Sequence, residues 1–461
     1  MTGRHTTIVG AGLAGSLMSI LLGKRGVPVR LLERRPDLRK HDLSAGRSIN
    51  LALSDRGIHA LKQAGVYSAV EPLLTAMPGR CIHDLDGNTQ FVSYGQRAHE
   101  VIYSVSRTGL NQVLLNEAEK LPTVDISFSV ECHTADFTQQ QLHLVDPSTG
   151  RVYREDYTTL IGADGSNSPL RQALLMDKPS LVSSELLPHG YKELTLPAGN
   201  SGQHQLQQHA LHIWPRGGFM LIALPNLDGS FTVTLFLPFE NPTKPDECFS
   251  GLNDVHSVRA FFGKYFADVL TLMPDLAEEL LAHHTGKMVT VRSSRWTDGN
   301  NAMLIGDAAH AIVPFHGQGM NCAFEDCVEL DALMQQHPQP SAFTQFEAAR
   351  LPNANAIADM ALENYLEMRD TVRHPKFLLQ KELSFELERR FPEQFIPRYS
   401  MVMFHHEIPY AVAYTRGQIQ MDILNTLTSN TQHIDEVSSL LSAQLVQEKL
   451  SHLFADKPTI R

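Results

Sequence analysis

A glycine-rich turn near the N-terminus restricts the fold of this chain more than any other feature. Residues 6–33 read as a strand (TTIVG), a turn (AGLAG), an apolar-periodic helix that runs to Gly26, and a second strand (VPVRLLE). A strand, a crossover helix and a parallel strand in this order form a βαβ unit. We therefore predict an α/β chain that opens with part of a parallel sheet.

The glycine spacing of this turn suits a dinucleotide. Gly10 allows a tight turn, Gly12 lets a pyrophosphate approach the backbone, and Gly15 lets the helix pack closely on the strand. The N-terminus of the helix offers unpaired N–H groups to the phosphates. Glu33 ends the second strand about 20 residues further on, where an acid accepts hydrogen bonds from an unphosphorylated ribose, as in FAD or NAD. A glycine turn alone could be structural, but strand, helix and acid together predict a Rossmann-like dinucleotide site.

Two later motifs place glycine beside aspartate. Asp164-Gly165 follows a strand predicted at 157–161, and Gly306-Asp307 follows an apolar run and precedes Gly317-Gln318-Gly319 at the start of a helix. The first motif alone reads as a turn, and the second as a helix start chosen for packing, although the N–H groups there favour negative charge. The helix that follows has a predicted apolar face of Met320, Ala323, Phe324, Cys327, Val328 and Met334.

The length and composition of the chain exclude several classes of protein and partner. The chain has 461 residues, which is enough for two domains. Its net charge of −11, without a basic block, argues against nucleic acid as the main partner. The five cysteines form no Cys-x-x-Cys pair, so we expect neither a disulfide framework nor a metal site, and a reducing cytoplasm fits. No apolar run is long enough to span a bilayer, so we expect a soluble protein.

The three glycine motifs, taken in this order, resemble those of the FAD-dependent aromatic hydroxylases, the single-component flavoprotein monooxygenases of the p-hydroxybenzoate hydroxylase type. Within that group the chain is similar to the kynurenine 3-monooxygenases. The likeness runs from Ile8 to about Gly417 and is carried by "GRSINLALSDRG" (46–57), "HGYKEL" (189–194), "LHIWPRGGFMLIALPNLDGSFTVTLF" (211–236), "PFHGQGMNCAFEDC" (314–327), "ALENYLEM" (361–368) and "PRYSMVMF" (397–404).

The resemblance implies a Rossmann-like FAD-binding domain that is interleaved with a mixed β-sheet substrate domain and followed by a C-terminal helical region. The sequence pattern agrees, with strand-like runs at 81–105, a hairpin at 219–237, a helix over 55–70, and mainly helices after Met320, which Pro338, Pro397 and Pro409 punctuate. We expect the FAD-binding domain at 1–75, 101–180 and 286–345, the substrate domain at 76–100 and 181–285, and the helical region at 346–461.

The resemblance also implies the cofactor contacts. Asp307 would accept hydrogen bonds from the ribityl chain, and the helix that begins near Gly319 would point its positive end at the flavin ring. Arg107 alone would read as a surface arginine. The full set is Gly10, Gly12, Leu13, Ala14, Gly15, Leu32, Glu33, Arg34, Arg35, Ala52, Arg107, Asp164, Gly306, Asp307, Gly317, Gln318, Gly319, Met320 and Asn321.

For the substrate, L-kynurenine, the resemblance implies a cation for the carboxylate and apolar walls for the ring. The head-group partners would be Arg80, Tyr94, Asn364 and Tyr399. The wall residues would be Tyr191, Met220, Ile222, Leu224, Phe236, Phe315 and His316. Without the resemblance, all of these wall residues would read as core, and His316 as a structural histidine.

The implied reaction hydroxylates the ring beside its amine. NADPH reduces FAD, O₂ adds at flavin C4a, and the resulting hydroperoxide transfers OH to the ring. We assign no catalytic base, because the ring amine already activates the carbon. The NADPH site, the oligomeric state (a homodimer is one option) and the use of residues 418–461 stay open. The alternatives are a hydroxylase of another aromatic acid, or a non-catalytic binding protein with the same fold.

Overall fold

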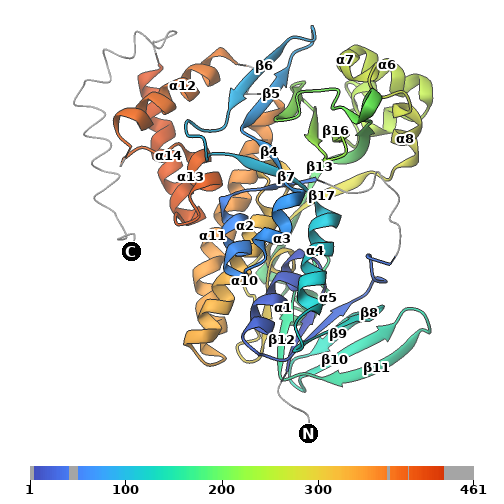
Figure 1. Cartoon of the computed structure of the whole chain (residues 1–461), viewed down its shortest axis with the longest axis vertical. Coiled ribbons are helices and arrows are strands. Elements are labelled where there is room, and N and C mark those ends of the chain that lie inside the picture. The colour runs from blue at the N-terminus through green and yellow to red at the C-terminus, as the bar shows by residue number, and fades with distance from the viewer. Residues whose placement is uncertain (1–4, 41–49, 371–373, 393, 430–461) are drawn as a thin grey trace.

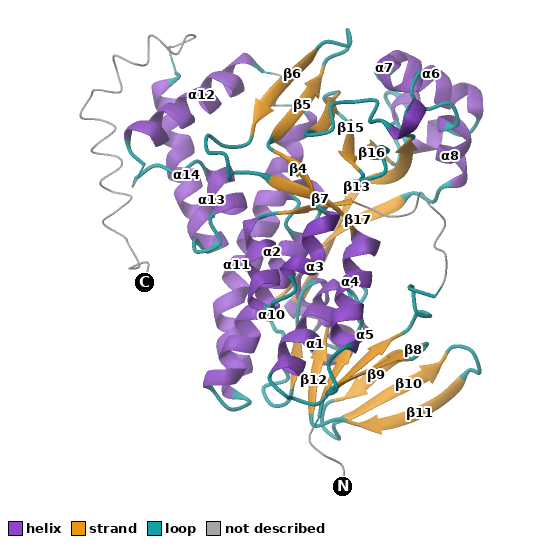
Figure 2. Ribbon diagram, in the orientation of Figure 1, coloured by secondary structure: helices purple, strands orange, loops and turns teal. Residues whose placement is uncertain are grey.

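The computed structural model describes residues 5–40, 50–370, 374–392 and 394–429. In Figure 1 a parallel sheet lies near the N-terminus, a larger mixed sheet lies at the opposite end of the molecule, and the C-terminal helices pack at one side. Figure 2 shows helices α1 (Leu13–Lys24), α10 (Gly319–Gln336) and α11 (Ser341–Arg369) running through the middle of the molecule.

The parallel sheet has five strands in the order β18-β12-β1-β2-β8. Their bounds are Ala302–Leu304, Thr159–Gly162, Thr6–Val9, Val29–Glu33 and Val124–Phe128. The predicted βαβ unit is confirmed, because β1 and β2 pair in parallel and α1 connects them. Strands β1, β12 and β18 are neighbours and run in the same direction, so the three glycine motifs that follow them lie at one edge of the sheet.

Glycine is required where α1 approaches β1. A side chain at Gly15 would overlap the carbonyl oxygen of Gly10. Gly10 itself has a φ of +100°, a conformation that other residues rarely adopt. Helices α4 (Arg107–Glu119) and α10 pack against α1. The expectation of one apolar face on α10 was too narrow, because Cys322 and Asp326 on its other side are also buried, where α11 and α2 (Asp55–Gln63) cover the helix.

The mixed sheet has seven strands in the order β17-β13-β16-β15-β14-β5-β6. Their bounds are Gly286–Ser293, Val182–Leu196, Phe231–Pro238, Met220–Pro225, Leu211–Pro215, Gly79–His83 and Thr89–Ser93. The predicted hairpin is confirmed, since β15 and β16 pair antiparallel with Met220 opposite Phe236. Helices α6 (Val255–Tyr265), α7 (Ala267–Leu270) and α8 (Leu276–Ala282) share an apolar core with one face of this sheet.

The remaining strands of the described residues form two small sheets of three strands each. The first joins β3 (Asn50–Leu53), β7 (Ile102–Ser106) and β4 (Thr75–Met77). The second joins β9 (Glu131–Asp136), β10 (Gln141–Asp146) and β11 (Arg151–Asp156) beside the parallel sheet, and the sequence pattern did not suggest it. The single helix expected over 55–70 is two helices, α2 and α3 (Tyr67–Val70), because Gly65 between them has a positive φ of +62°.

The C-terminal helices follow the predicted proline positions. After α11 come α12 (Pro375–Arg390), α13 (Arg398–Phe404) and α14 (Tyr410–Leu427), with Pro397 and Pro409 as the N-cap residues of the last two. Helix α12 is tied to the loop after β6 by the ion pair of Arg97 with Glu388, 2.9 Å apart. Residues 430–461, the greater part of the segment whose use the sequence left open, lie outside the described residues.

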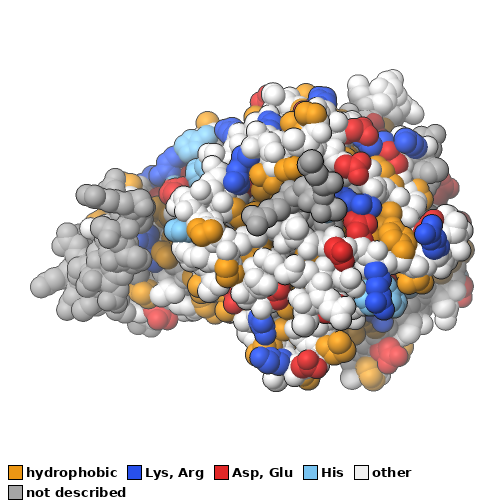
Figure 3. Space-filling model, turned by 90° about the horizontal axis from the view of Figure 1, so that it is seen from below, with side chains coloured by type: hydrophobic (Ala, Val, Ile, Leu, Met, Phe, Trp, Pro, Cys, Tyr) orange, Lys and Arg blue, Asp and Glu red, His pale blue; other side chains and the backbone are white. Residues whose placement is uncertain are grey.

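On the face that Figure 3 displays, basic and acidic side chains of the described residues are interspersed rather than gathered by sign. All five cysteines are free and buried. Within the described ranges, no helix has the length and apolar character needed to cross a membrane.

Candidate active site

The first glycine turn is held at the carboxyl end of β1 by Glu33. The Ala11 N–H donates to Glu33 Oε2 at 2.9 Å, and the Arg35 N–H donates to Glu33 Oε1 at 3.0 Å. A carboxylate has about four acceptor positions, so it retains capacity for a ribose. A Cβ added at Gly12 would meet nothing within 4 Å. Open space at the N-terminus of α1, beside an acid with acceptor positions to spare, fits the diphosphate and ribose of FAD.

The second motif contributes the carboxylate of Asp164, one oxygen of which accepts no hydrogen bond from the described residues. Asp164 Oδ2 accepts from the Leu170 N–H at 3.2 Å, whereas Oδ1 is buried and has no partner among the described residues. Burial raises the pKa of this carboxyl. Arg171, on α5 (Pro169–Leu174), binds the backbone oxygens of Ala308 and Ser166 at 2.8 and 2.5 Å, which joins this loop to the third motif.

The third motif is anchored by a buried ion network. Gly306 has a φ of +57°, and its N–H donates to Asp326 Oδ2 at 2.9 Å. The same carboxylate binds His310 Nε2 at 2.6 Å and Arg350 Nε at 2.8 Å. The sequence analysis assigned no role to His310, Asp326 or Arg350, because the pairing of these side chains depends on how α10 and α11 pack.

Asp307 stands beside this anchor. Its side chain is open to solvent, although many protein atoms lie around the carboxyl group. Burial raises the pKa of its carboxyl, and the positive charge of Arg107 acts in the opposite direction. Arg107 is also exposed, at the first position of α4. The two residues predicted as cofactor contacts are therefore brought together electrostatically from distant parts of the chain.

At the start of α10, backbone N–H groups rather than side chains are available to a cofactor. Gln318 is fully buried and accepts from the Tyr410 hydroxyl at 2.8 Å. The Asn321 amide donates to the backbone oxygens of Ala52 and Gly317 at 2.9 and 2.8 Å and accepts from the Ser54 N–H. Because both side chains are engaged inside the protein, any cofactor contact there falls to the N–H groups of the first turn, which have no intrahelical partners.

The other predicted cofactor residues surround these three turns. Gly15, Leu32, Gly306 and Met320 are buried, Gly10 is partly exposed, and Arg34 and Arg35 are exposed. The remainder are partly exposed, namely Leu13, Ala14, Ala52, Gly317 and Gly319. A side chain at Gly317, whose φ is +66°, would lie 3.0 Å from the Ala52 Cβ, which brings β3 close to α10.

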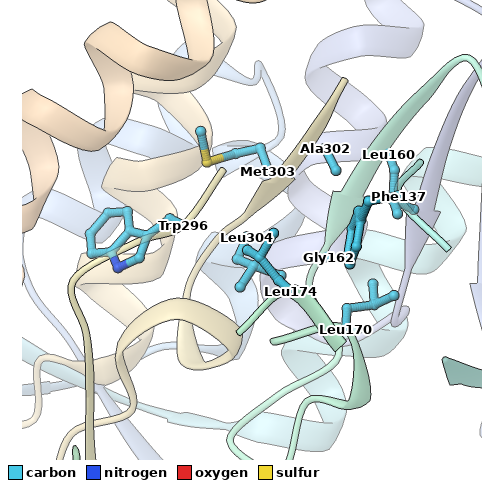
Figure 4. Close-up of a pocket in the computed structure, with 9 residues that line it drawn as sticks. All are labelled: Phe137, Leu160, Gly162, Leu170, Leu174, Trp296, Ala302, Met303 and Leu304. Carbon is cyan, nitrogen blue, oxygen red and sulfur yellow. The ribbon is translucent and has the colours of Figure 1, made fainter. Parts of the chain in front are cut away.

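Figure 4 shows a different space, against strands β12 and β18 of the parallel sheet. It is lined by Phe137, Leu160, Gly162, Leu170, Leu174, Trp296, Ala302, Met303 and Leu304. The one polar side-chain group here, the Trp296 indole N–H, already donates to the Ser293 oxygen at 2.8 Å. A ligand site needs a few polar groups to orient its occupant, so we assign this space to the packing of the fold.

A cavity of about 130 Å³ lies between the mixed sheet and the C-terminal helices. All four predicted head-group residues line it: Arg80, Tyr94, Asn364 and Tyr399. Arg80 Nη2 lies 3.4 Å from Glu367 Oε1, and its buried Nε has no partner among the described residues. The Tyr94 and Tyr399 rings stack with centroids 5.4 Å apart.

His316 also lines this cavity and stacks on Tyr399 at 5.5 Å. Burial lowers the pKa of His316 to about 4, so the imidazole is neutral at neutral pH. Its backbone neighbour Phe315 is fixed by the Asn364 amide, which donates to the Phe315 oxygen at 2.6 Å. This contact links the head-group residues to the 3₁₀ turn Pro314–His316 that precedes α10.

The other predicted wall residues lie outside the lining of this cavity. Phe236 packs on Phe315 at 5.0 Å, and Phe315 stacks on Tyr365 at 4.0 Å. Met220 belongs to the same apolar cluster, which Tyr191 and Ile222 flank, and Leu224 belongs to the neighbouring one. Their contact with a substrate ring stays a prediction.

Sequence reasoning missed the wall that the C-terminal helices supply. Helix α12 contributes Phe377, Lys381 and Phe385, and α14 contributes Gln420 and Leu424. Glu367 could have been predicted from the sequence, since it lies three residues after Asn364 and so shares its helix face. The residues of α12 carried no such signal, because their polar positions resemble an ordinary solvated helix.

Comparison with known proteins agrees with this geometry. The family model described as "FAD binding domain" matches residues 4–361. A protein named kynurenine 3-monooxygenase from Myxococcus xanthus (strain DK1622) is 46% identical over 446 residues, which cover 96% of this chain and 95% of the relative. A protein of that name from Stenotrophomonas maltophilia (strain K279a) is 46% identical over 444 residues, which cover 96% of each chain.

Two solved structures share the fold. One is the tetrameric form of 2-methyl-3-hydroxypyridine-5-carboxylic acid oxygenase, with a TM-score of 0.64, 22% identity, and coverage of 81% of this chain and 95% of that one. The other is PqsL of P. aeruginosa in complex with 2-aminobenzoylacetate, with a TM-score of 0.62, 20% identity, and coverage of 80% and 97%.

The parallel sheet, its three glycine motifs and the matched family model define the class as an FAD-dependent monooxygenase. A cation, two tyrosines and an amide line a cavity beside the flavin motifs. Within this class, the chain belongs to the kynurenine 3-monooxygenase family.

Proposed function

We propose that this chain hydroxylates L-kynurenine to 3-hydroxy-L-kynurenine with NADPH and O₂, on bound FAD. The observation that carries the proposal is the cavity in which Arg80, Tyr94, Asn364 and Tyr399 meet, in a chain that belongs to this family. A guanidinium with free N–H groups binds a carboxylate, and a neighbouring acid, Glu367, suits an α-ammonium.

Each group of residues has a distinct role in this proposal. FAD, when bound, supplies the electron transfer and the activation of O₂. The backbone of Gly10–Gly15, the acid Glu33 and the first turn of α10 hold the cofactor. Arg80 and its neighbours hold the amino-acid head, so that the ring of the substrate is directed toward the Phe315–Gly317 turn. The apolar walls exclude water, which would limit the release of H₂O₂ without hydroxylation of the substrate.

No residue is proposed as a general base. His316 is the titratable group nearest to the junction of cavity and turn, and burial lowers its pKa to about 4, which makes it a weak proton acceptor. The amine of the ring supplies the electron density that the hydroxylation needs. We propose that His316 serves by stacking on Tyr399 rather than by moving a proton.

The domain division is likewise proposed: FAD binding by 1–75, 101–180 and 286–345, substrate binding by 76–100 and 181–285, and a helical cover from 346 onward. Strands β5 and β6, from 76–100, join the mixed sheet as this division requires, whereas β17, at the start of the 286–345 segment, also pairs into the mixed sheet and lies on the substrate side of it. A cytoplasmic location is supported by the free cysteines. A homodimer stays an option that gel filtration decides.

The decisive experiment follows NADPH oxidation by the yellow holoenzyme, with and without L-kynurenine, and identifies the product by mass. Stimulated oxidation that yields 3-hydroxykynurenine is the expected result. Stimulated oxidation that yields only H₂O₂ would falsify the proposal. A panel of aromatic acids that includes 2-aminobenzoylacetate, the ligand in the PqsL structure, tests for a hydroxylase of another acid. A colourless protein would indicate a non-catalytic binder.

A further inference from the structure

Lys381 lies on the α12 wall of the substrate cavity without a counter-ion. Its side chain lines the cavity, and within the described residues its ammonium makes no ion pair or hydrogen bond. It lies 5.6 Å from the centroid of the Phe385 ring. One helical turn earlier on the same face, Phe377 packs under the Arg80 guanidinium, 5.9 Å from its ring centroid. Arg80 and Lys381 therefore approach the cavity from adjoining elements.

The charges around this end of the cavity do not balance. Among the lining residues, the cations are Arg80, Lys381 and Arg398, and the one acid is Glu367. Arg398 is paired with Glu363 outside the lining, and Arg80 shares Glu367. The remaining titratable neighbours are neutral, since burial raises the pKa of Tyr94 and Tyr399 and lowers that of His316. The ammonium of Lys381 is therefore left without an ion-pair partner among the described residues.

A cation that is partly removed from solvent and has no partner is unfavourable, and Lys381 is half-buried on the cavity wall. Burial, with Arg80 as a second cause, lowers the pKa of Lys381 to about 7, although the negative charge of Glu367 acts in the opposite direction. An anion placed between Arg80 and Lys381 would remove this imbalance. The carboxylate of the substrate is the anion that the proposed function brings to this place.

We propose that Lys381 is a second cationic binding residue for the carboxylate of the substrate, contributed by α12 beside Arg80. The proposal rests on the proposed function and adds to it a specificity residue from the C-terminal helices. Helix α12 then has two roles, because it closes the cavity and supplies half of the positive charge that a carboxylate meets there.

A pH dependence of substrate affinity follows. An adjacent anion favours the charged form, so bound substrate raises the pKa of Lys381 above its value in the free enzyme. Below about pH 7 Lys381 is already protonated, and affinity does not depend on its titration. Above about pH 7 binding must take up a proton, and affinity falls as the pH rises, by up to about tenfold per pH unit.

The test titrates oxidised holoenzyme with L-kynurenine in the absence of NADPH and follows the visible absorbance of FAD. Lys381→Met should weaken binding by roughly 10- to 100-fold at about pH 6.5. Lys381→Arg keeps its charge at every pH, so it should bind at about pH 6.5 and lose the fall in affinity between about pH 7 and 9. Lys376→Met, which removes an exposed lysine from the same helix, is the matched control and should bind like wild type.

The decarboxylated amine analogue of kynurenine separates the carboxylate from the rest of the ligand, and wild type and Lys381→Met should bind it equally. The proposal is overturned if Lys381→Met binds kynurenine like wild type, or if Lys381→Arg retains the full pH dependence. The second result is informative even where the methionine variant loses FAD. In either case the proposed function stands as long as wild type hydroxylates kynurenine, whereas a wild type that does not bind kynurenine refutes the function itself.

Discussion

Replacing Asp326 by alanine removes the anchor of the Gly306-Asp307 turn. Asp326 is fully buried and binds the Gly306 N–H at 2.9 Å, His310 Nε2 at 2.6 Å and Arg350 Nε at 2.8 Å. Among the described residues, its removal leaves the buried Arg350 with one ionic partner, the half-buried Glu325, 3.1 Å away. Breaking a buried ion pair from one side costs about 3–5 kcal/mol. We expect Asp326→Ala to lower the free energy of unfolding by about that amount and to weaken FAD binding.

The assay combines urea unfolding with FAD retention on gel filtration. Asp359→Ala is the matched control, because it breaks the Arg292–Asp359 pair at 2.6 Å, where both side chains are partly open to solvent. Exposed pairs contribute about 0–1 kcal/mol. An Asp326→Ala protein that is no less stable than Asp359→Ala, and that keeps its flavin equally well, would refute the role of this network.

The ionisation of Asp326 also makes the stability of the fold depend on pH, and the direction of that dependence can be stated. Burial acts to raise the pKa of Asp326, but His310 and Arg350 outweigh it, so the folded pKa lies below the ordinary value. The ionised form therefore stabilises the fold above about pH 4, and this contribution is lost as the pH falls through the folded pKa. Asp326→Asn should remove that acid-dependent part of the stability. An acid-unfolding curve with the same shape as wild type would contradict the assignment.

The remaining predictions concern the two binding regions. Arg80→Ala should weaken kynurenine binding by roughly 2–3 kcal/mol while FAD stays bound, as measured by the flavin absorbance titration, and unchanged affinity would exclude Arg80 as a head-group residue. Gly12→Ala should fold normally, since its Cβ meets no protein atom within 4 Å, yet lose affinity for FAD, whereas Gly15→Ala should lose stability because its Cβ overlaps backbone. Equal stability of the two variants would contradict this distinction. His316→Asn should leave the pH profile of kcat unchanged between about pH 6 and 8, because the pKa of His316 lies at about 4, and the loss of an inflection in that range would reveal a proton-transfer role.

The local elements could be predicted because each depends on neighbouring residues. The βαβ unit of residues 6–33 follows from apolar periodicity and glycine sterics, and the hairpin of β15 and β16 follows from two alternating runs around a turn. Pro397 and Pro409 set the starts of α13 and α14, since proline suits the boundary of a helix. The sequence also determined that the chain carries three glycine motifs, together with an acid at Glu33.

Only the tertiary structure decided which side chains meet, because packing joins residues that are far apart in the chain. The parallel order of β1, β12 and β18 brings the three motifs to one edge. Packing also turned Gln318 and Asn321 inward, where Tyr410 and Ala52 occupy their polar atoms. Periodicity could not reveal that α12 lies over the cavity, since the side chain of Lys381 looks the same on a solvated helix as beside a substrate. Its position depends on where the helix docks, which no local pattern encodes.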